Sequence, residues 1–196
     1  MILIFKKLFF IFIILKFKSN KNFSYKDLNF RKLDYTNYNQ VKSFIFKKSF
    51  YKNNSKNIHN FDFLNFSNKL GGKIGINLSK ESIFGWFQIN KNKLGFPWSK
   101  DLPSKRLINL LYNYEYINSS SSPRNKKKLD SIIYFHIQRV LFDFNNKKIT
   151  QITSFDIAGY LLSCFIIKKI NNKNIGYAKF VADNQIDKLG MHKSYN

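Results

Sequence analysis

The stretch of sequence that decides the fold is IAGYLLSCFIIKKINNKNIGYAKFV, residues 157–181. Ile157 to Ile170 form a long apolar run, Asn171 to Asn174 form a polar connection, and Ile175 to Val181 form a second apolar segment. Asparagine tolerates left-handed backbone geometry, so an Asn-rich connection between two apolar segments favours a β-hairpin. The pattern therefore predicts two antiparallel strands near the end of the chain.

A helix is expected before this hairpin. Between Leu129 and Phe142, apolar side chains are spaced to give a wide apolar face, which is typical of an amphipathic helix. Four serines at 119–122 precede Pro123 and mark the clearest boundary in the chain. The predicted fold class is therefore α+β, with a helix and a short antiparallel sheet in a small C-terminal domain, residues 122–196. A long basic, aromatic-rich extension precedes it.

This extension divides into two predicted parts. Residues 1–70 alternate lysine and asparagine with isolated aromatics, which suits a basic extended arm, although an ordinary exposed loop region fits equally well. Residues 71–121 form a lineage-specific extension with strand and helix elements. Gly71-Gly72 breaks the chain, residues 73–78 alternate like a strand, and residues 105–116 have near-helical spacing.

The first 18 residues are apolar with interspersed lysines. Their uninterrupted apolar run, Leu8 to Leu15, is too short to span a bilayer, which takes about 20 residues. We expect a buried or surface-docking segment here. A membrane-surface segment and a targeting segment are the alternatives for residues 1–18.

The charge balance is strongly basic. Lysine and arginine total 34 against 11 acids, which gives a net charge of +23. The abundance of Lys, Asn, Phe, Ile and Tyr is typical of a gene in an AT-rich genome, but that bias does not explain the scarcity of acids. Lysine clusters interleaved with aromatics favour a structured RNA partner. These clusters are Lys47-Lys48, Lys126 to Lys128, Lys147-Lys148 and Lys168-Lys169.

No catalytic chemistry is predicted. The acids are scattered, the three histidines lie far apart, and no metal-binding or nucleotide-binding motif is present. His136 lies on an apolar helix face and is expected to be a core histidine. Cys164, the single cysteine, is expected to be an inert buried thiol. The prediction is a protein without enzymatic activity, cofactor or metal.

The C-terminal sequence also shows an ordered set of short motifs. An opening Pro-Arg with lysines is followed by a helix ending in Arg-Val, a basic loop, two strands and a Lys-Leu-Gly close. These motifs are Pro123–Lys128, Ile132–Val140, Asn146–Lys148, Ile157–Tyr160 with Phe180–Val181, and Lys188–Gly190. In this order they resemble the small-subunit ribosomal protein nineteen family of bacteria and organelles. The family's Gly-Pro-Phe is replaced by Leu129–Ser131.

The resemblance implies a small α+β domain bound to ribosomal RNA in the head of the small subunit, beside other ribosomal proteins. Together with the charge pattern it predicts a structural constituent of a mitochondrial ribosome, organelle-encoded, that binds rRNA through lysine clusters. The side chains expected to contact phosphates are Arg124, Lys126, Lys127, Lys128, Lys147, Lys148, Lys168, Lys169, Lys188 and Lys193.

A membrane-associated accessory subunit of an organellar respiratory complex is the alternative function. It rests on residues 1–18 and on the many aromatic residues. A mean hydropathy of −0.34 and the lack of an apolar run near 20 residues weigh against membrane contact.

Overall fold

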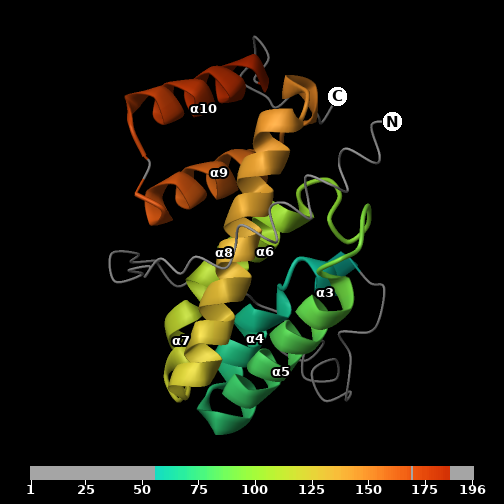
Figure 1. Ribbon diagram of the computed structural model, residues 1–196, viewed down its shortest axis with the longest axis vertical. Helices are drawn as coiled ribbons and strands as arrows, with labels where there is room; N and C mark the ends of the chain where they lie inside the picture. The colour runs from blue at the N-terminus through green and yellow to red at the C-terminus, as the bar shows by residue number, and fades with distance from the viewer. Residues whose placement is uncertain (1–55, 169, 186–196) are drawn as a thin grey trace.

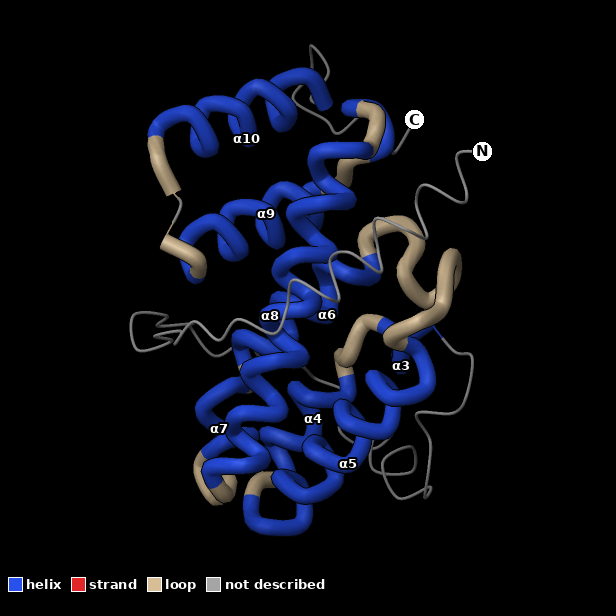
Figure 2. The backbone as a smooth tube through the Cα atoms, in the orientation of Figure 1, coloured by secondary structure: helices blue, strands red, loops and turns tan. Residues whose placement is uncertain are grey.

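The computed structural model describes residues 56–168 and 170–185, and within these ranges it is 78% helix with no strands. Figure 2 shows the helices and the short loops that join them. The elements are α3 (Lys56–His59), α4 (Phe63–Leu70), α5 (Gly72–Asn90), α6 (Leu102–Tyr112), α7 (Tyr114–Asn118), α8 (Pro123–Asn146), the 3-10 helix η2 (Ile149–Gln151), α9 (Ser154–Ile166) and α10 (Asn172–Gln185).

The 24-residue helix α8 organises this arrangement. Figure 1 shows α8 running along the long axis, with α4, α5 and α7 around its N-terminal half and α9 and α10 beside its C-terminal half. At 1.5 Å per residue, α8 is about 36 Å long. Features at its two ends are therefore far apart.

The main core joins residues from both sides of the serine loop at 119–122. It contains buried Ile83 and Trp86 of α5 and Leu107 of α6, together with Ile133 and Val140 of α8. Helix α6 packs against both α8 and α9. The serine loop therefore connects helices that share one core.

A smaller apolar cluster lies at the C-terminal end of α8. Phe144 of α8 stacks on Tyr160 of α9 with ring centroids 4.1 Å apart, and Ala178 and Val181 of α10 close the cluster. Helix α10 buries these two residues and leaves Phe180 exposed.

The predicted C-terminal hairpin, and with it the α+β fold class, is wrong. Residues 154–166 form α9 and residues 172–185 form α10. Helix α9 packs against α6, α8 and α10, and its exposed side also carries apolar residues, Phe155, Ala158 and Phe165, so its sequence lacks the polar face that reveals a helix. A capping box starts it: Thr153 Oγ1 accepts from the Asp156 backbone N–H, and the Asp156 carboxylate accepts from the Thr153 N–H.

The predicted strand at 73–78 is also wrong, because these residues lie within α5. Ile76 is buried but Ile74 is 73% exposed, so the alternating apolar residues do not share one buried face of α5. A Cβ on Gly75 would lie 2.7 Å from the Ser67 carbonyl oxygen and 2.3 Å from the Tyr116 hydroxyl, so only glycine fits. The helix predicted at 129–142 is confirmed within α8.

The N-terminal predictions lie mostly outside the described ranges. The apolar segment 1–18 falls there entirely, as does the proposed arm up to residue 55. Of the helices that the structure does describe, none combines the length and the apolar character needed to cross a membrane.

Candidate nucleic-acid interface

The N-terminus of α8 carries the densest group of basic side chains that the sequence predicted as phosphate contacts. Ser122 caps the helix and Pro123 occupies its first turn. Arg124, Lys126, Lys127 and Lys128 follow, and all four are exposed. The first turn contains no acid. Cations are disfavoured at a helix N-terminus, because the helix dipole is positive there, so this segment concentrates positive potential at a cost to the helix.

These four side chains have no ion-pair partner within 56–168 and 170–185. The ion pairs in those ranges join Lys105 to Asp101, Arg139 to Asp143 and Lys147 to Asp156. The nearest acid on α8, Asp130, accepts a 2.7 Å hydrogen bond from the Tyr114 hydroxyl. Burial raises the pKa of Asp130, while the Tyr114 hydrogen bond and the charge of Lys126 act against the rise.

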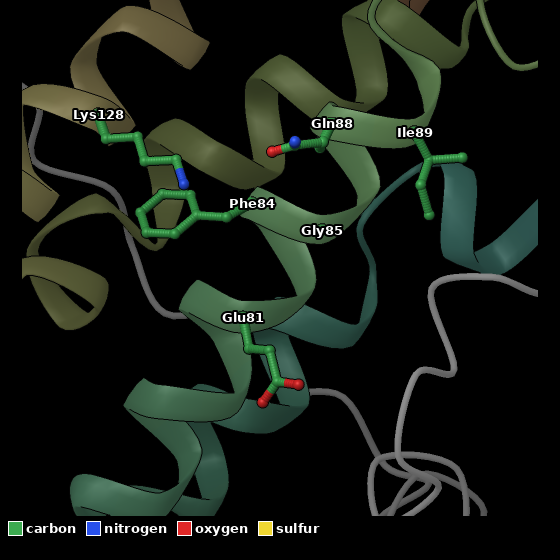
Figure 3. Close-up of a pocket in the computed structure, with 6 residues that line it drawn as sticks. All are labelled: Glu81, Phe84, Gly85, Gln88, Ile89 and Lys128. Atoms are coloured by element: carbon green, nitrogen blue, oxygen red, sulfur yellow. The ribbon is translucent and has the colours of Figure 1, made fainter.

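An open groove lies beside this basic helix end. Its volume is about 460 Å³, it is open to solvent, and α5 and α8 line it. Lys128 of α8 reaches toward the Phe84 ring of α5 (Figure 3), and its Nζ lies 4.3 Å from the ring centroid. The rest of the lining comes from α5: Glu81, Gly85, Gln88 and Ile89.

The other predicted phosphate contacts do not gather at this end. Lys147 is occupied, because its Nζ lies 2.8 Å from an Asp156 carboxylate oxygen and donates to the Lys100 carbonyl. Lys148 is exposed beyond the opposite end of α8, and Lys168 is exposed in the turn after α9. Lys169, Lys188 and Lys193 lie outside the described residues.

A second polar cluster lies in the core. Arg106 is fully buried between two indole rings, with its guanidinium carbon 4.3 Å from the Trp86 ring and 4.4 Å from the Trp98 ring. Its Nη1 donates to the carbonyls of His59 and Pro97. Burial lowers the pKa of Arg106, and nearby Arg139 adds to this effect while Asp143 opposes it.

Two buried histidines flank Arg106 in defined tautomers. His136 Nδ1 donates to the Ile132 carbonyl and its Nε2 accepts from Arg106 Nε at 3.1 Å. His59 Nδ1 accepts from Trp86 Nε1 at 3.0 Å. Burial and the charge of Arg106 lower the pKa of His59 to about 4 and of His136 to about 3. Both histidines are therefore neutral near pH 7, and the prediction that His136 is a core histidine is confirmed.

This cluster is part of the core, because Arg106 and His136 are fully buried and His59 is 3% exposed. Cys164 is buried, as predicted. No group of three His, Cys, Asp or Glu side chains able to hold a metal ion occurs in the described part of the chain. The groove and the α8 N-terminus are therefore the stronger candidate site.

Comparison of the chain with protein-family models, characterised proteins and solved structures found no match. The resemblance to ribosomal protein nineteen remains a prediction, and the strands that carry part of it are helices here.

Phe84 and Gln88 were not among the predicted site residues. Phe84 lies among the apolar residues Ile83, Trp86 and Phe87, which gives it the appearance of an ordinary core residue. The available signal was weak: Glu81, Gln88 and the Gly85 between them sit at helical spacing on α5. Sequence alone does not show that this face lies opposite Lys128, 44 positions away from Phe84.

Proposed function

We propose that this protein is a structural RNA-binding protein of an organellar ribonucleoprotein, with the mitochondrial small ribosomal subunit as the specific candidate. It binds rRNA by neutralising backbone phosphates and performs no catalysis. The observation that carries the proposal is the cluster of Arg124 and Lys126 to Lys128, which is exposed, lacks ion pairs in the described residues and stands on the helix end that repels cations. An RNA phosphate supplies the missing negative charge.

The overall charge supports the same function. A net charge of +23 on 196 residues gives long-range attraction to a polyanion. The resemblance to ribosomal protein nineteen gives this proposal little weight, because residues 154–166 and 172–185 are helical. The ribosomal location rests on the lysine clusters and on the scarcity of acids.

The test is a salt titration of binding between the full chain and a fluorescently labelled fragment of small-subunit rRNA. Each phosphate contact contributes about −0.7 to −0.9 to the slope of log K against log salt. Changing Arg124 and Lys126 to Lys128 together to glutamine is expected to make the slope shallower by about three. Changing Lys105, which is ion-paired with Asp101 and is not among the predicted phosphate contacts, to glutamine is the control and is expected to leave the slope unchanged.

An affinity that stays flat from about 50 to about 300 mM salt would contradict phosphate binding. The ribosomal location is tested separately, by sedimentation of native organelle lysate. The protein is expected with small-subunit particles and is expected to leave them after RNase treatment. Retention in a carbonate-washed membrane pellet would instead favour the respiratory-complex alternative.

A further inference from the structure

The groove between α5 and α8 combines an aromatic face with a cation. Phe84 is half-buried and packs against the main core, so its ring is held in place by the fold. Lys128 covers this ring, with its Nζ 4.3 Å from the centroid. A lysine stem is flexible and its ammonium is strongly hydrated. Lys128 can therefore move from the ring to an arriving phosphate and leave the aromatic face open.

The polar groups of the groove are distributed unevenly. Lys128 lines the α8 wall. Arg124 is exposed one helical turn before it on the same side of α8, so a second cation lies next to that wall. The α5 wall carries Gln88, whose amide both donates and accepts, and Glu81, whose carboxylate accepts hydrogen bonds and repels phosphate. A phosphate is therefore favoured at the α8 wall, and a hydrogen-bonding base edge is favoured at the α5 wall.

We infer that this groove binds one unpaired nucleotide of RNA, with its base stacked on Phe84 and its phosphate on Lys128 and Arg124. The inference rests on the proposed RNA-binding function and makes it more specific. Stacking on an aromatic side chain accepts any base and requires that the base be free of a duplex. This groove therefore binds single-stranded or bulged RNA in preference to a duplex.

A similar pair, Lys105 of α6 and Phe155 of α9, supplies a matched control. Lys105 Nζ also lies 4.3 Å from an exposed phenyl ring, that of Phe155. There, however, the lysine is held by an ion pair with Asp101, at 2.9 Å. Since this cation is already neutralised, the Phe155 pair is expected to contribute nothing to RNA binding.

The experiment compares the affinity of the full-length protein for a labelled single-stranded RNA of about twelve nucleotides and for the corresponding duplex. Phe84→Leu keeps an apolar side chain and removes the ring. We expect it to weaken binding to the single strand about 5- to 150-fold, the value of one stacked base. The salt slope and duplex binding are expected to stay unchanged. Lys128→Gln is expected to make the salt slope shallower by about one, and Phe155→Leu is expected to match the wild type.

A second measurement uses the wild-type protein, so it does not depend on how well a variant folds. The same single-stranded RNA carrying 5-bromouridine is cross-linked by ultraviolet light and the protein is digested with trypsin. The cross-link is expected in the peptide Glu81–Lys91, at Phe84. For the three variants of the first experiment, circular dichroism measures whether each is folded.

Two failures are distinguishable. If the wild type does not bind RNA at all, the proposed function fails. If it binds with a steep salt slope, but Phe84→Leu binds single strands normally and the cross-link lies on another peptide, RNA binding stands and the nucleotide site is overturned. Retained RNA affinity in Phe84→Leu together with loss of a protein partner would also overturn it, in favour of a peptide-binding groove.

Discussion

Arg106 shows how a single buried cation can be accommodated without an ion pair in the described part of the chain. Its charge is distributed over two indole faces, and its donors reach two backbone carbonyls and the Nε2 atom of His136. Arginine suits this position because its planar guanidinium stacks and donates in fixed directions. A lysine could not make both kinds of contact.

Removing this side chain is expected to destabilise the fold strongly. Arg106→Ala opens a cavity between Trp86 and Trp98 and leaves two buried carbonyls without a donor. We expect the free energy of unfolding to fall by about 3–5 kcal/mol in urea denaturation. Exposed Arg124 is the matched control, since Arg124→Ala is expected to change it by less than about 0.5 kcal/mol. Equal stability of the two variants would contradict the assigned role of Arg106.

The histidines beside Arg106 make stability sensitive to acid. Their folded-state pKa values, about 4 for His59 and about 3 for His136, lie below the ordinary 6.5. As the pH falls below 6.5, the unfolded chain binds protons first. The stabilisation is therefore complete above pH 6.5 and is lost as the pH falls toward 4, by up to about 1.4 kcal/mol per pH unit for each histidine.

Urea unfolding at pH 7 and at pH 5 measures this loss. His136→Gln keeps an acceptor for Arg106 and removes one titrating group, so its stability is expected to depend less steeply on pH. Burial raises the pKa of Asp130 and Asp143, which favours the folded state in acid. The difference between wild type and variant isolates the histidine contribution. Equal pH dependence in both would show that the pKa of His136 is not lowered by folding.

The N-terminus of α8 has only part of the capping that would stabilise it, and it carries basic residues that destabilise it. Ser122 Oγ accepts from the Asn125 backbone N–H at 3.3 Å, which is half of a capping box. The other half requires an acid or glutamine at position 125. In its place, the first turn contains only neutral and basic residues.

Asn125→Glu is expected to complete the box. We expect it to stabilise the protein by about 0.5–1 kcal/mol in thermal or urea unfolding while weakening RNA binding, because it reduces the positive potential at the α8 N-terminus. Asn145→Glu, in the last turn of the same helix, makes the same charge change at the opposite end. It is expected to destabilise slightly and to affect RNA binding less. Equal RNA affinity of the two variants would argue against binding at the N-terminus.

Sequence reasoning succeeded for elements with one polar face and failed for those without. Within residues 129–142 of α8, the polar residues Asp130, Ser131, Tyr134 and Gln138 recur at helical spacing among apolar ones, so the helix was predictable. Helix α9 leaves Phe155, Ala158 and Phe165 exposed, so its solvent-facing side is itself apolar and shows no such period. The Thr153–Asp156 capping pair was its best local signal. Gly159 misleads as well, since it is there because a Cβ would lie 2.9 Å from the Ser104 Cβ atom of α6. That contact depends on tertiary packing.

The candidate site also has one part that could be predicted from the sequence and one part that could not. Arg124 and Lys126 to Lys128 are contiguous, so the chain itself brings them together. The groove depends on the approach of Phe84 to Lys128, which local sequence cannot report. The prediction of Lys147 as a phosphate contact also missed a tertiary contact. Lys147 forms an ion pair with Asp156 at the start of α9, in a region predicted to be a loop before a strand.

For the whole molecule, positive charge is in excess and mostly unneutralised. A net charge of +23 opposes the compact state by self-repulsion. Raising NaCl from about 0.05 to 0.5 M shortens the screening distance severalfold and is therefore expected to raise the Tm. The same change is expected to weaken RNA binding. Thermal melts and binding titrations on one sample measure both effects, and a Tm that falls with salt would contradict self-repulsion as the main effect of the excess charge.

Helix α10 packs through Ala178 and Val181, while Ile175, Tyr177 and Phe180 remain exposed. Detaching it uncovers the smaller cluster around Phe144 and Tyr160 but leaves the main core intact. Its amide hydrogens are therefore expected to exchange with deuterium through sub-global opening, earlier than those of α6, whose Leu107 and Leu110 are fully buried. Mass spectrometry of peptides from each helix reports this order. The C-terminal helix would thus be the first cooperative unit to come apart, with the rest of the bundle still folded.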